Sequence, residues 1–185
     1  MRKFSLVALF VLLCGMYAVA QDYSKGEFYA GYQYLHVDVG SSGIDSSWPA
    51  GFNFDGTYYF AKNIGVTADF GYNKHSFSGG TDAHTYEFLF GPRFKARSGK
   101  LEPFAHALFG VAHTGVQPGV GSSFSDSAFA LALGGGLDVG VAKHFAIRLA
   151  EFNYVMTRFA TTSSVNINGQ DHQNNFTFGV GVVIR

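Results

Sequence analysis

Apolar and polar residues alternate with a period of two along most of the chain after residue 20. Such alternation, interrupted by turn residues, is typical of β-strands whose two faces meet different surroundings. Most of the segments reach the length of about nine residues that a tilted strand needs to cross a bilayer. The pattern predicts eight strands, at residues 27–37, 51–60, 64–76, 84–96, 101–113, 128–142, 144–158 and 175–185.

The connections between these segments alternate in length. Residues 61–63, residues 97–100 and the junction at 143–144 are tight, and the basic residues Lys62, Lys95, Arg97, Lys100 and Lys143 gather near them. Outer-membrane barrels have short periplasmic turns and longer extracellular loops. The order therefore predicts an all-β fold, an eight-stranded antiparallel up-and-down transmembrane β-barrel with its basic residues at one periplasmic rim. The longer connections, rich in Ser, Gly, Asp, Asn and Thr, are 38–50, 77–83, 114–127 and 159–174.

The two faces of the predicted strands differ in side-chain size. In the last strand, Phe, Val and Ile alternate with Asn, Thr and Gly. The seventh strand is less regular, because Glu151 and Asn153 share a face with Ile147 and Leu149, and we expect a bulge or an early exit from the membrane there. Composition agrees with a wall facing lipid, since 14 % of the residues are charged, against about 25 % in an ordinary soluble domain.

A soluble lipocalin-like periplasmic barrel would instead point the aromatic residues inward. Eight strands enclose an interior that side chains barely fill, and four or five large apolar residues from each strand would overfill it. Gly, Ala, Thr and Asn suit a narrow lumen, where backbone segments approach closely. We therefore assign the apolar face to lipid, with the soluble barrel as the less favoured alternative. Trp48 falls in a predicted loop.

Polar and ionisable residues fall on the face assigned to the lumen. Charges there are costly unless they are paired, so we expect Arg93 and Arg148 to join several carboxylates in a structural network that fills the lumen. The same face carries Gln33, Asn53 and Asn73. The predicted network consists of Glu27, Asp55, Asp69, Glu87, Arg93, Glu102, His106, Asp138 and Arg148.

The segment HTYEFLFGPRF, residues 84–94, combines both faces. Its aromatic positions face lipid, whereas Glu87 and Arg93 face the lumen. Pro92 has no backbone N–H to donate, and a closed barrel has no free edge where that loss would be harmless. We therefore expect a bulge or a local break in the ladder at Gly91-Pro92.

The first twenty residues have the pattern of a secretory signal peptide, with Arg2 and Lys3, an apolar run, and Ala18-Val19-Ala20. We predict cleavage after Ala20, so that 1–20 is the signal peptide and 21–185 is an outer-membrane β-barrel domain. Lipoprotein processing at Cys14 is the alternative, although Leu13 stands where a small residue is usual. The remaining chain would have no cysteine and no basic tract, which excludes disulfides and argues against nucleic-acid binding.

Five segments carry a resemblance to a known family: FYAGYQYLHVD, FLFGPRF, PFAHALFGVAHTG, GGGLDVGV and FTFGVGVVIR. The chain resembles the OmpA-like and OmpX-like small eight-stranded barrels of the Gram-negative outer membrane. The resemblance implies location in the cell outer membrane, with outer-membrane lipid and lipopolysaccharide as surroundings. It also implies the barrel-assembly machinery as a partner during insertion. The chain departs from the pattern by ending in Arg185 instead of an aromatic residue.

No catalytic motif accompanies these features. His75-Ser76 and His113-Thr114 are neighbours on strands and point to opposite faces, so neither pair forms a dyad. The seven histidines lack zinc-ligand spacing, and we expect no metal, no cofactor and no catalytic residue. We expect a non-enzymatic protein that serves envelope integrity or binds a surface ligand through its four longer loops. The alternatives are a lipid A-modifying barrel enzyme and a narrow pore.

Overall fold

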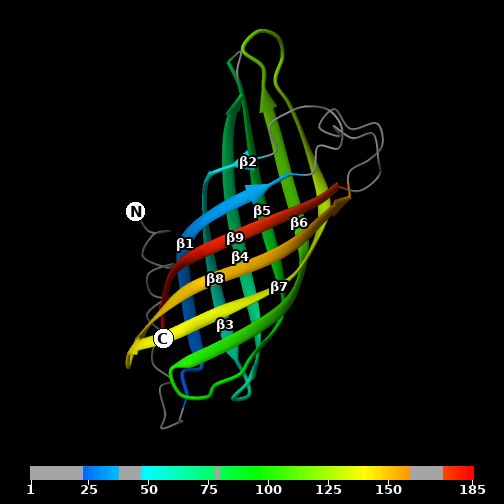
Figure 1. The fold of residues 1–185 in the computed structure, drawn as a ribbon. Helices are drawn as coiled ribbons and strands as arrows, with labels where there is room; N and C mark the ends of the chain where they lie inside the picture. The colour runs from blue at the N-terminus through cyan, green and yellow to red at the C-terminus, as the bar shows by residue number, and fades with distance from the viewer. Residues whose placement is uncertain (1–22, 38–46, 78–79, 159–172) are drawn as a thin grey trace, which may run out of the picture.

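The fold is one antiparallel sheet that closes on itself (Figure 1). The computed structural model describes residues 23–37, 47–77, 80–158 and 173–185. The eight long strands pair in chain order, and β1 also pairs with β9 along residues 28–36. The sheet is therefore a closed eight-stranded antiparallel barrel, which confirms the predicted fold class. Within the described residues the strands are β1 (Gly26–His36), β2 (Ser47–Trp48), β3 (Ala50–Tyr59), β4 (Ile64–Phe77), β5 (Thr81–Lys95), β6 (Leu101–Gln117), β7 (Phe124–Ala142), β8 (Phe145–Arg158) and β9 (Gln173–Ile184).

The two ends of the barrel differ in height. At one end, the turn end, the connections β3–β4, β5–β6 and β7–β8 are short. At the other, the hairpin end, the β4–β5 and β6–β7 hairpins rise above the neighbouring strands, as Figure 1 shows. The first and last described residues lie at the turn end. The predicted signal peptide and its cleavage site lie outside the described residues and stay predictions.

The expected loops at 77–83 and 114–127 were wrong over much of their length. Phe77 ends β4, Thr81 begins β5, Gln117 ends β6 and Phe124 begins β7. Trp48, expected in a loop, belongs to the short β2, which pairs with the end of β1. Above a membrane both faces of a hairpin meet water, so its strands carry the same Ser, Thr and Gly residues that mark loops.

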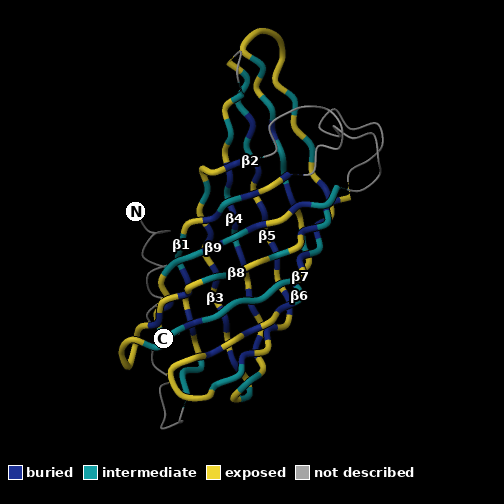
Figure 2. Tube along the Cα trace, in the orientation of Figure 1, coloured by how far each residue is buried: buried dark blue, intermediate teal, exposed yellow. Residues whose placement is uncertain are grey.

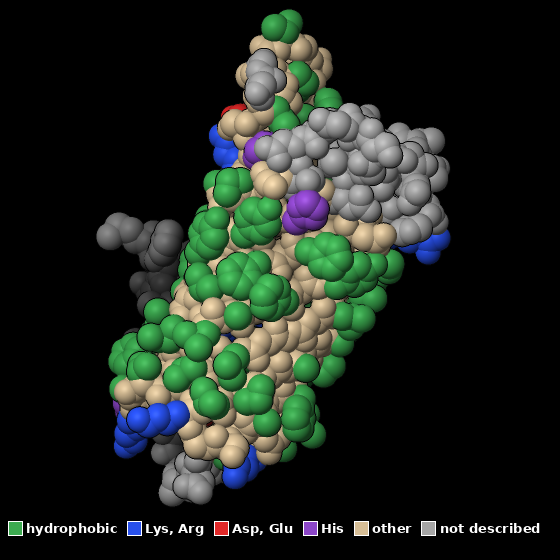
Figure 3. Space-filling model, viewed as in Figure 1, with side chains coloured by type: hydrophobic (Ala, Val, Ile, Leu, Met, Phe, Trp, Pro, Cys, Tyr) green, Lys and Arg blue, Asp and Glu red, His purple; other side chains and the backbone are tan. Residues whose placement is uncertain are grey.

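Residues in the barrel wall alternate between buried and exposed (Figure 2). The contrast is clear at neighbouring positions, because Phe88 is 67 % exposed whereas Glu87 is 5 % exposed. Hydrophobic side chains cover the middle of the outer face in Figure 3. The aromatic face is therefore outside and the polar face inside, opposite to the lipocalin-like arrangement. No helix among the described residues is long and apolar enough to cross a membrane.

Two irregularities were expected, and both are present. The β8–β9 register shifts between Arg148 and Glu151, which confirms the bulge expected in the seventh predicted strand and turns Glu151 inward. The β5–β6 ladder lacks partners at Gly91 and Pro92 and resumes in the same register at Arg93, so the irregularity is a break without a bulge. A Cβ on Gly91 would lie 2.1 Å from the carbonyl oxygen of Ala107. Only glycine therefore fits beside this backbone.

Candidate functional site

The centre of the lumen is built around Asp55 of β3. Its carboxylate accepts two parallel hydrogen bonds from the guanidinium of Arg93 on β5, each 2.9 Å long. It also accepts one from Nη1 of Arg148 on β8, at 2.7 Å. Bidentate arginine–carboxylate pairs are among the strongest hydrogen-bonded contacts in proteins. One carboxylate thus ties together three strands from across the barrel.

Arg148 extends this cluster in two directions. Its Nε donates to Oδ1 of Asp138 on β7 at 2.9 Å, and its Nη1 donates to Oε2 of Glu151 at 2.7 Å. The guanidinium carbon lies 4.0 Å from the ring centroid of Tyr29 and 4.3 Å from that of Phe104. Aromatic faces attract such cations. Arg148 is fully buried, and these contacts compensate for its lost hydration.

A second cation, Lys95, fills the lumen nearer the turn end. Its Nζ lies 2.5 Å from Oε2 of Glu27, 2.8 Å from Oδ2 of Asp138 and 3.6 Å from Oε2 of Glu102. Glu27 also accepts a hydrogen bond from Arg97 at 2.9 Å, and Arg185 donates to Glu102. The placement of Lys95 at a basic rim was wrong. The period of two puts its side chain on the inner face with that of Arg93.

His106 borders the central cluster on the side of the hairpin end. A guanidinium can only donate, so the 3.2 Å contact between Nη2 of Arg93 and Nδ1 of His106 makes Nδ1 the acceptor. Nε2 then carries the proton, which it donates to Oδ1 of Asn153 at 2.7 Å. These contacts fix His106 in one neutral tautomer. Because both ring nitrogens are engaged, the imidazole is not available as a base.

All nine predicted network residues lie on the inner face and are buried. Contacts connect seven of them into one cluster with Lys95 and Glu151: Glu27, Asp55, Arg93, Glu102, His106, Asp138 and Arg148. Asp69 is outside it and accepts from Asn53 at 3.0 Å. Glu87 is also outside it. Gln33 and Asn73 bond to each other at 2.8 Å.

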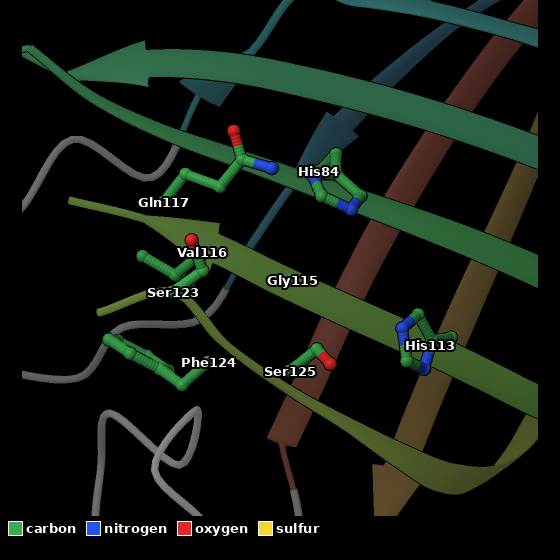
Figure 4. Close-up of a pocket in the computed structure, with 8 residues that line it drawn as sticks. All are labelled: His84, His113, Gly115, Val116, Gln117, Ser123, Phe124 and Ser125. Atoms are coloured by element: carbon green, nitrogen blue, oxygen red, sulfur yellow. The ribbon is translucent and has the colours of Figure 1, made fainter. Parts of the chain in front are cut away.

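A separate pocket of about 210 Å³ lies on the hairpins. His84, His113, Gly115 and Ser125 are among its lining residues, and Figure 4 shows the two imidazole rings well apart along the sheet. Nearby, Nδ1 of His113 lies 2.9 Å from Oγ of Ser127 on the adjacent strand. The contact between these two residues could not be predicted from the sequence, because it depends on the β6–β7 register. Among the described residues, no three His, Cys, Asp or Glu side chains form a metal-binding group.

The family model described as "Outer membrane protein beta-barrel domain" matches residues 6–183. The chain belongs to this family. The protein is therefore an outer-membrane barrel. In such barrels the short turns usually face the periplasm and the longer connections face the exterior.

Solved structures of outer-membrane barrels share the fold. Ail, the attachment invasion locus protein of Yersinia pestis, has a TM-score of 0.60 at 22 % identity, covering 86 % of this chain and 96 % of Ail. Neisserial surface protein A has a TM-score of 0.64 at 15 % identity, covering 87 % of this chain and 97 % of the other. The N-terminal barrel of Pseudomonas aeruginosa OprF has a TM-score of 0.50 at 10 % identity, covering 87 % and 97 %. These identities show a shared fold alone. A comparison with curated proteins found no significant match.

Proposed function

We propose that this outer-membrane barrel is non-enzymatic and that the polar network plugs its lumen. The observation that supports the proposal is the burial of Arg93, Lys95 and Arg148, each at 1 % exposure or less, among carboxylates from opposite walls. Eight strands leave an interior that is just wide enough for side chains. A lumen occupied by five paired cations and their carboxylates has no room for a wide aqueous path.

Conductance measurements test the plug. The full-length mature protein, incorporated into planar bilayers, is expected to give no stable porin-sized steps. A porin added to the same bilayer serves as the positive control. Reproducible large steps from this protein would contradict the plug and favour the narrow-pore alternative.

We propose that the hairpin end carries the interaction surface, for envelope integrity or for a ligand outside the cell. The β6–β7 hairpin supports this. Phe129 is the outermost residue of β7 that pairs with β8 among the described residues, and the pairing of β6 with β7 continues beyond it to Phe124. The names of Ail and of Neisserial surface protein A refer to attachment and surface location in those proteins. Here they motivate only the choice of assay.

Replacing residues 117–123 with a two-residue Asn-Gly turn shortens the tip while keeping the pairing of Val116 with Phe124, and it tests this surface. Cells expressing the variant are expected to lose adhesion or detergent resistance that the parent protein confers. Replacing residues 98–100 at the turn end, which spares Arg97 and its bond to Glu27, is the matched control and is expected to leave both unchanged. Equal loss from both replacements, or from neither, would contradict the proposal. Electrophoresis with and without boiling verifies that each variant folds.

Lipid and lipopolysaccharide are the proposed surroundings of the outer face, and the barrel-assembly machinery is the proposed partner during insertion. The exposed rings of Phe88, Phe94 and Phe152 support the first. The family to which the chain belongs supports the second. Depletion of the assembly machinery is expected to reduce the heat-modifiable form in outer-membrane fractions.

The lipid A-modifying alternative gains one observation, the hydrogen bond between His113 and Ser127 at the outer edge of the wall. A hydroxyl beside an imidazole is the arrangement that activates a nucleophile. Among the described contacts, however, no carboxylate bonds to the other nitrogen of His113. We expect identical lipid A mass spectra from cells expressing the parent protein and Ser127→Ala. A mass change produced by the parent and absent from the variant would establish the enzyme instead.

A further inference from the structure

The buried charges of the lumen do not balance. Seven carboxylates are buried there, whereas the cationic side chains that pair with them number five: Arg93, Lys95, Arg97, Arg148 and Arg185. Every carboxylate with an ion pair belongs to the connected cluster around Asp55 and Asp138. The two without a cationic partner among the described residues are Asp69 and Glu87. The surplus is therefore two negative charges.

These two carboxylates lie together on one patch of the inner wall. Asp69 is on β4 and Glu87 is on β5, and the register pairs Gly71, two residues beyond Asp69, with Glu87. Side chains at such diagonal positions have Cβ atoms about 7–8 Å apart or somewhat closer. Both carboxylates thus reach the same volume of the lumen, on the hairpin side of the central cluster.

Of the two carboxylates, Glu87 has the less favourable surroundings. Its side chain is buried, with 5 % of the residue exposed to solvent. No hydrogen bond or ion pair connects its carboxylate to any described residue. The point that a Cβ on Gly71 would occupy lies 3.2 Å from Nε2 of Gln33, 3.4 Å from Oε2 of Glu87 and 3.5 Å from Oε1 of Gln33. The missing side chain of Gly71 therefore leaves a space that the Glu87 carboxylate and the Gln33 amide, from different strands, both approach.

Asn53 supplies an independent sign of a missing partner. It is opposite Gly71 on the neighbouring strand and donates its amide hydrogens to Asp69 and to the carbonyl of Phe70. Its Oδ1 is buried and accepts no hydrogen bond in the part of the chain that the structure describes. A buried acceptor without a donor is uncommon in native proteins and calls for an occupant.

We propose that this patch binds one divalent cation of the calcium class, held by the carboxylates of Asp69 and Glu87 with amide oxygens of Gln33 and Asn53. One divalent ion neutralises the surplus of two charges. Ca²⁺ prefers carboxylate and amide oxygens and tolerates irregular coordination, with water completing the shell. Histidine and cysteine spacing does not reveal such a site, because every ligand is an oxygen.

Calcium-dependent unfolding tests the proposal. The mature chain in detergent free of lipopolysaccharide is unfolded by heat at pH 7.5, with chelator or with Ca²⁺ at 100 times its dissociation constant. The midpoint is expected to rise by about 5–10 °C for the parent protein. Equilibrium dialysis with Ca²⁺ is expected to give one ion per chain. The variant Asp69→Asn with Glu87→Gln keeps the shapes but removes both charges, and it is expected to lose the shift and the bound ion.

The matched control is Asp82→Asn, which removes an exposed carboxylate from the hairpin end and is expected to keep the full response to Ca²⁺. In chelator, the double variant is expected to unfold at a higher temperature than the parent, because it no longer buries two uncompensated charges. If the parent shows no Ca²⁺-dependent shift, or if the double variant shows the same shift, the proposal is wrong.

Discussion

The lumen of this barrel is filled differently at its two ends. Toward the turn end, cations and carboxylates from six strands form the connected network around Asp55, Asp138 and Lys95. At the hairpin end the filling is an apolar cluster of buried side chains at strand ends. This cluster consists of Leu35, Val37, Trp48 and Ala83, with Phe77 and Val116 packed against it.

The two fillings respond differently to substitution. A buried ion network costs little only while every member has its partner, because removal of one charge leaves others uncompensated. An apolar cluster loses contacts in proportion to the atoms removed. The network therefore specifies which strands face one another, whereas the apolar cluster excludes water without demanding particular partners.

The largest expected effect comes from Arg148→Met, which preserves bulk but removes the charge shared by Asp55, Asp138 and Glu151. We expect a loss of about 3–5 kcal/mol in the free energy of unfolding, as for other broken buried pairs. Urea unfolding followed by the fluorescence of Trp48, the single tryptophan, measures it. A loss below that of an apolar truncation would contradict the contrast between the two fillings.

Leu35→Ala probes the apolar cluster. Leu35 is 2 % exposed, and its truncation is expected to reduce the free energy of unfolding by about 2–3 kcal/mol through lost burial and a cavity. Because Trp48 belongs to the same cluster, the boiling-dependent mobility shift is the better measure of unfolding here. Leu35→Met, which keeps the volume, is the control and should cost much less.

A double-mutant cycle separates pairing from burial in the network. Arg93→Met alone strands the carboxylate of Asp55, whereas Arg93→Met with Asp55→Asn removes both charges. The cycle is expected to show a coupling free energy of about 1–2 kcal/mol. Additive losses from the two single substitutions would mean that the bidentate pair adds no stability beyond its separate members.

The smallest effect is expected at the exposed pair of Lys74 and Asp82, which are 2.8 Å apart on the β4–β5 hairpin. The hydrogen bond from Lys74 lowers the pKa of the Asp82 carboxyl. A lowered pKa means that any stabilisation is present above the ordinary pKa of aspartate and is lost as the pH falls through the lowered value. Salt screens such pairs. Asp82→Asn should leave the unfolding midpoint at neutral pH and physiological salt unchanged within error.

Much of the barrel could be predicted from the alternation alone. The face on which Glu87 or Phe88 lies follows from a period of two, and the strand limits follow from turn residues. The irregularity at Gly91-Pro92 followed from the missing proline donor, and the bulge before Glu151 followed from a charged residue out of phase. In each case one local rule was enough.

Two kinds of feature could not be predicted: contacts with side chains on other strands, and how far the strands of a hairpin extend. The period of two puts Lys95 on the inner face with Arg93, but its contacts with Glu27 and Asp138 depend on partners from other strands. The contact of His113 with Ser127 depends on the register of two strands whose connection could have been shorter or longer. Residues 114–117 and 124–127 were assigned to a loop because Thr, Ser, Gly, Gln and Asp interrupt the alternation there, although Val116 and Phe124 pack against buried apolar residues.

The pairing of β1 with β9 joins Phe28 to Ile184, so the contact that closes the barrel is also among the most distant along the chain. Loop closure over such a separation is entropically unfavourable, and contacts of this kind slow folding. Until the final strand arrives, β1 presents an unpaired edge, which is a site for pairing with another chain. The barrel therefore passes through a period in which one edge of its first strand is unpaired, although the other edge pairs with β3. The arrival of the last strand, twelve residues long, ends that period.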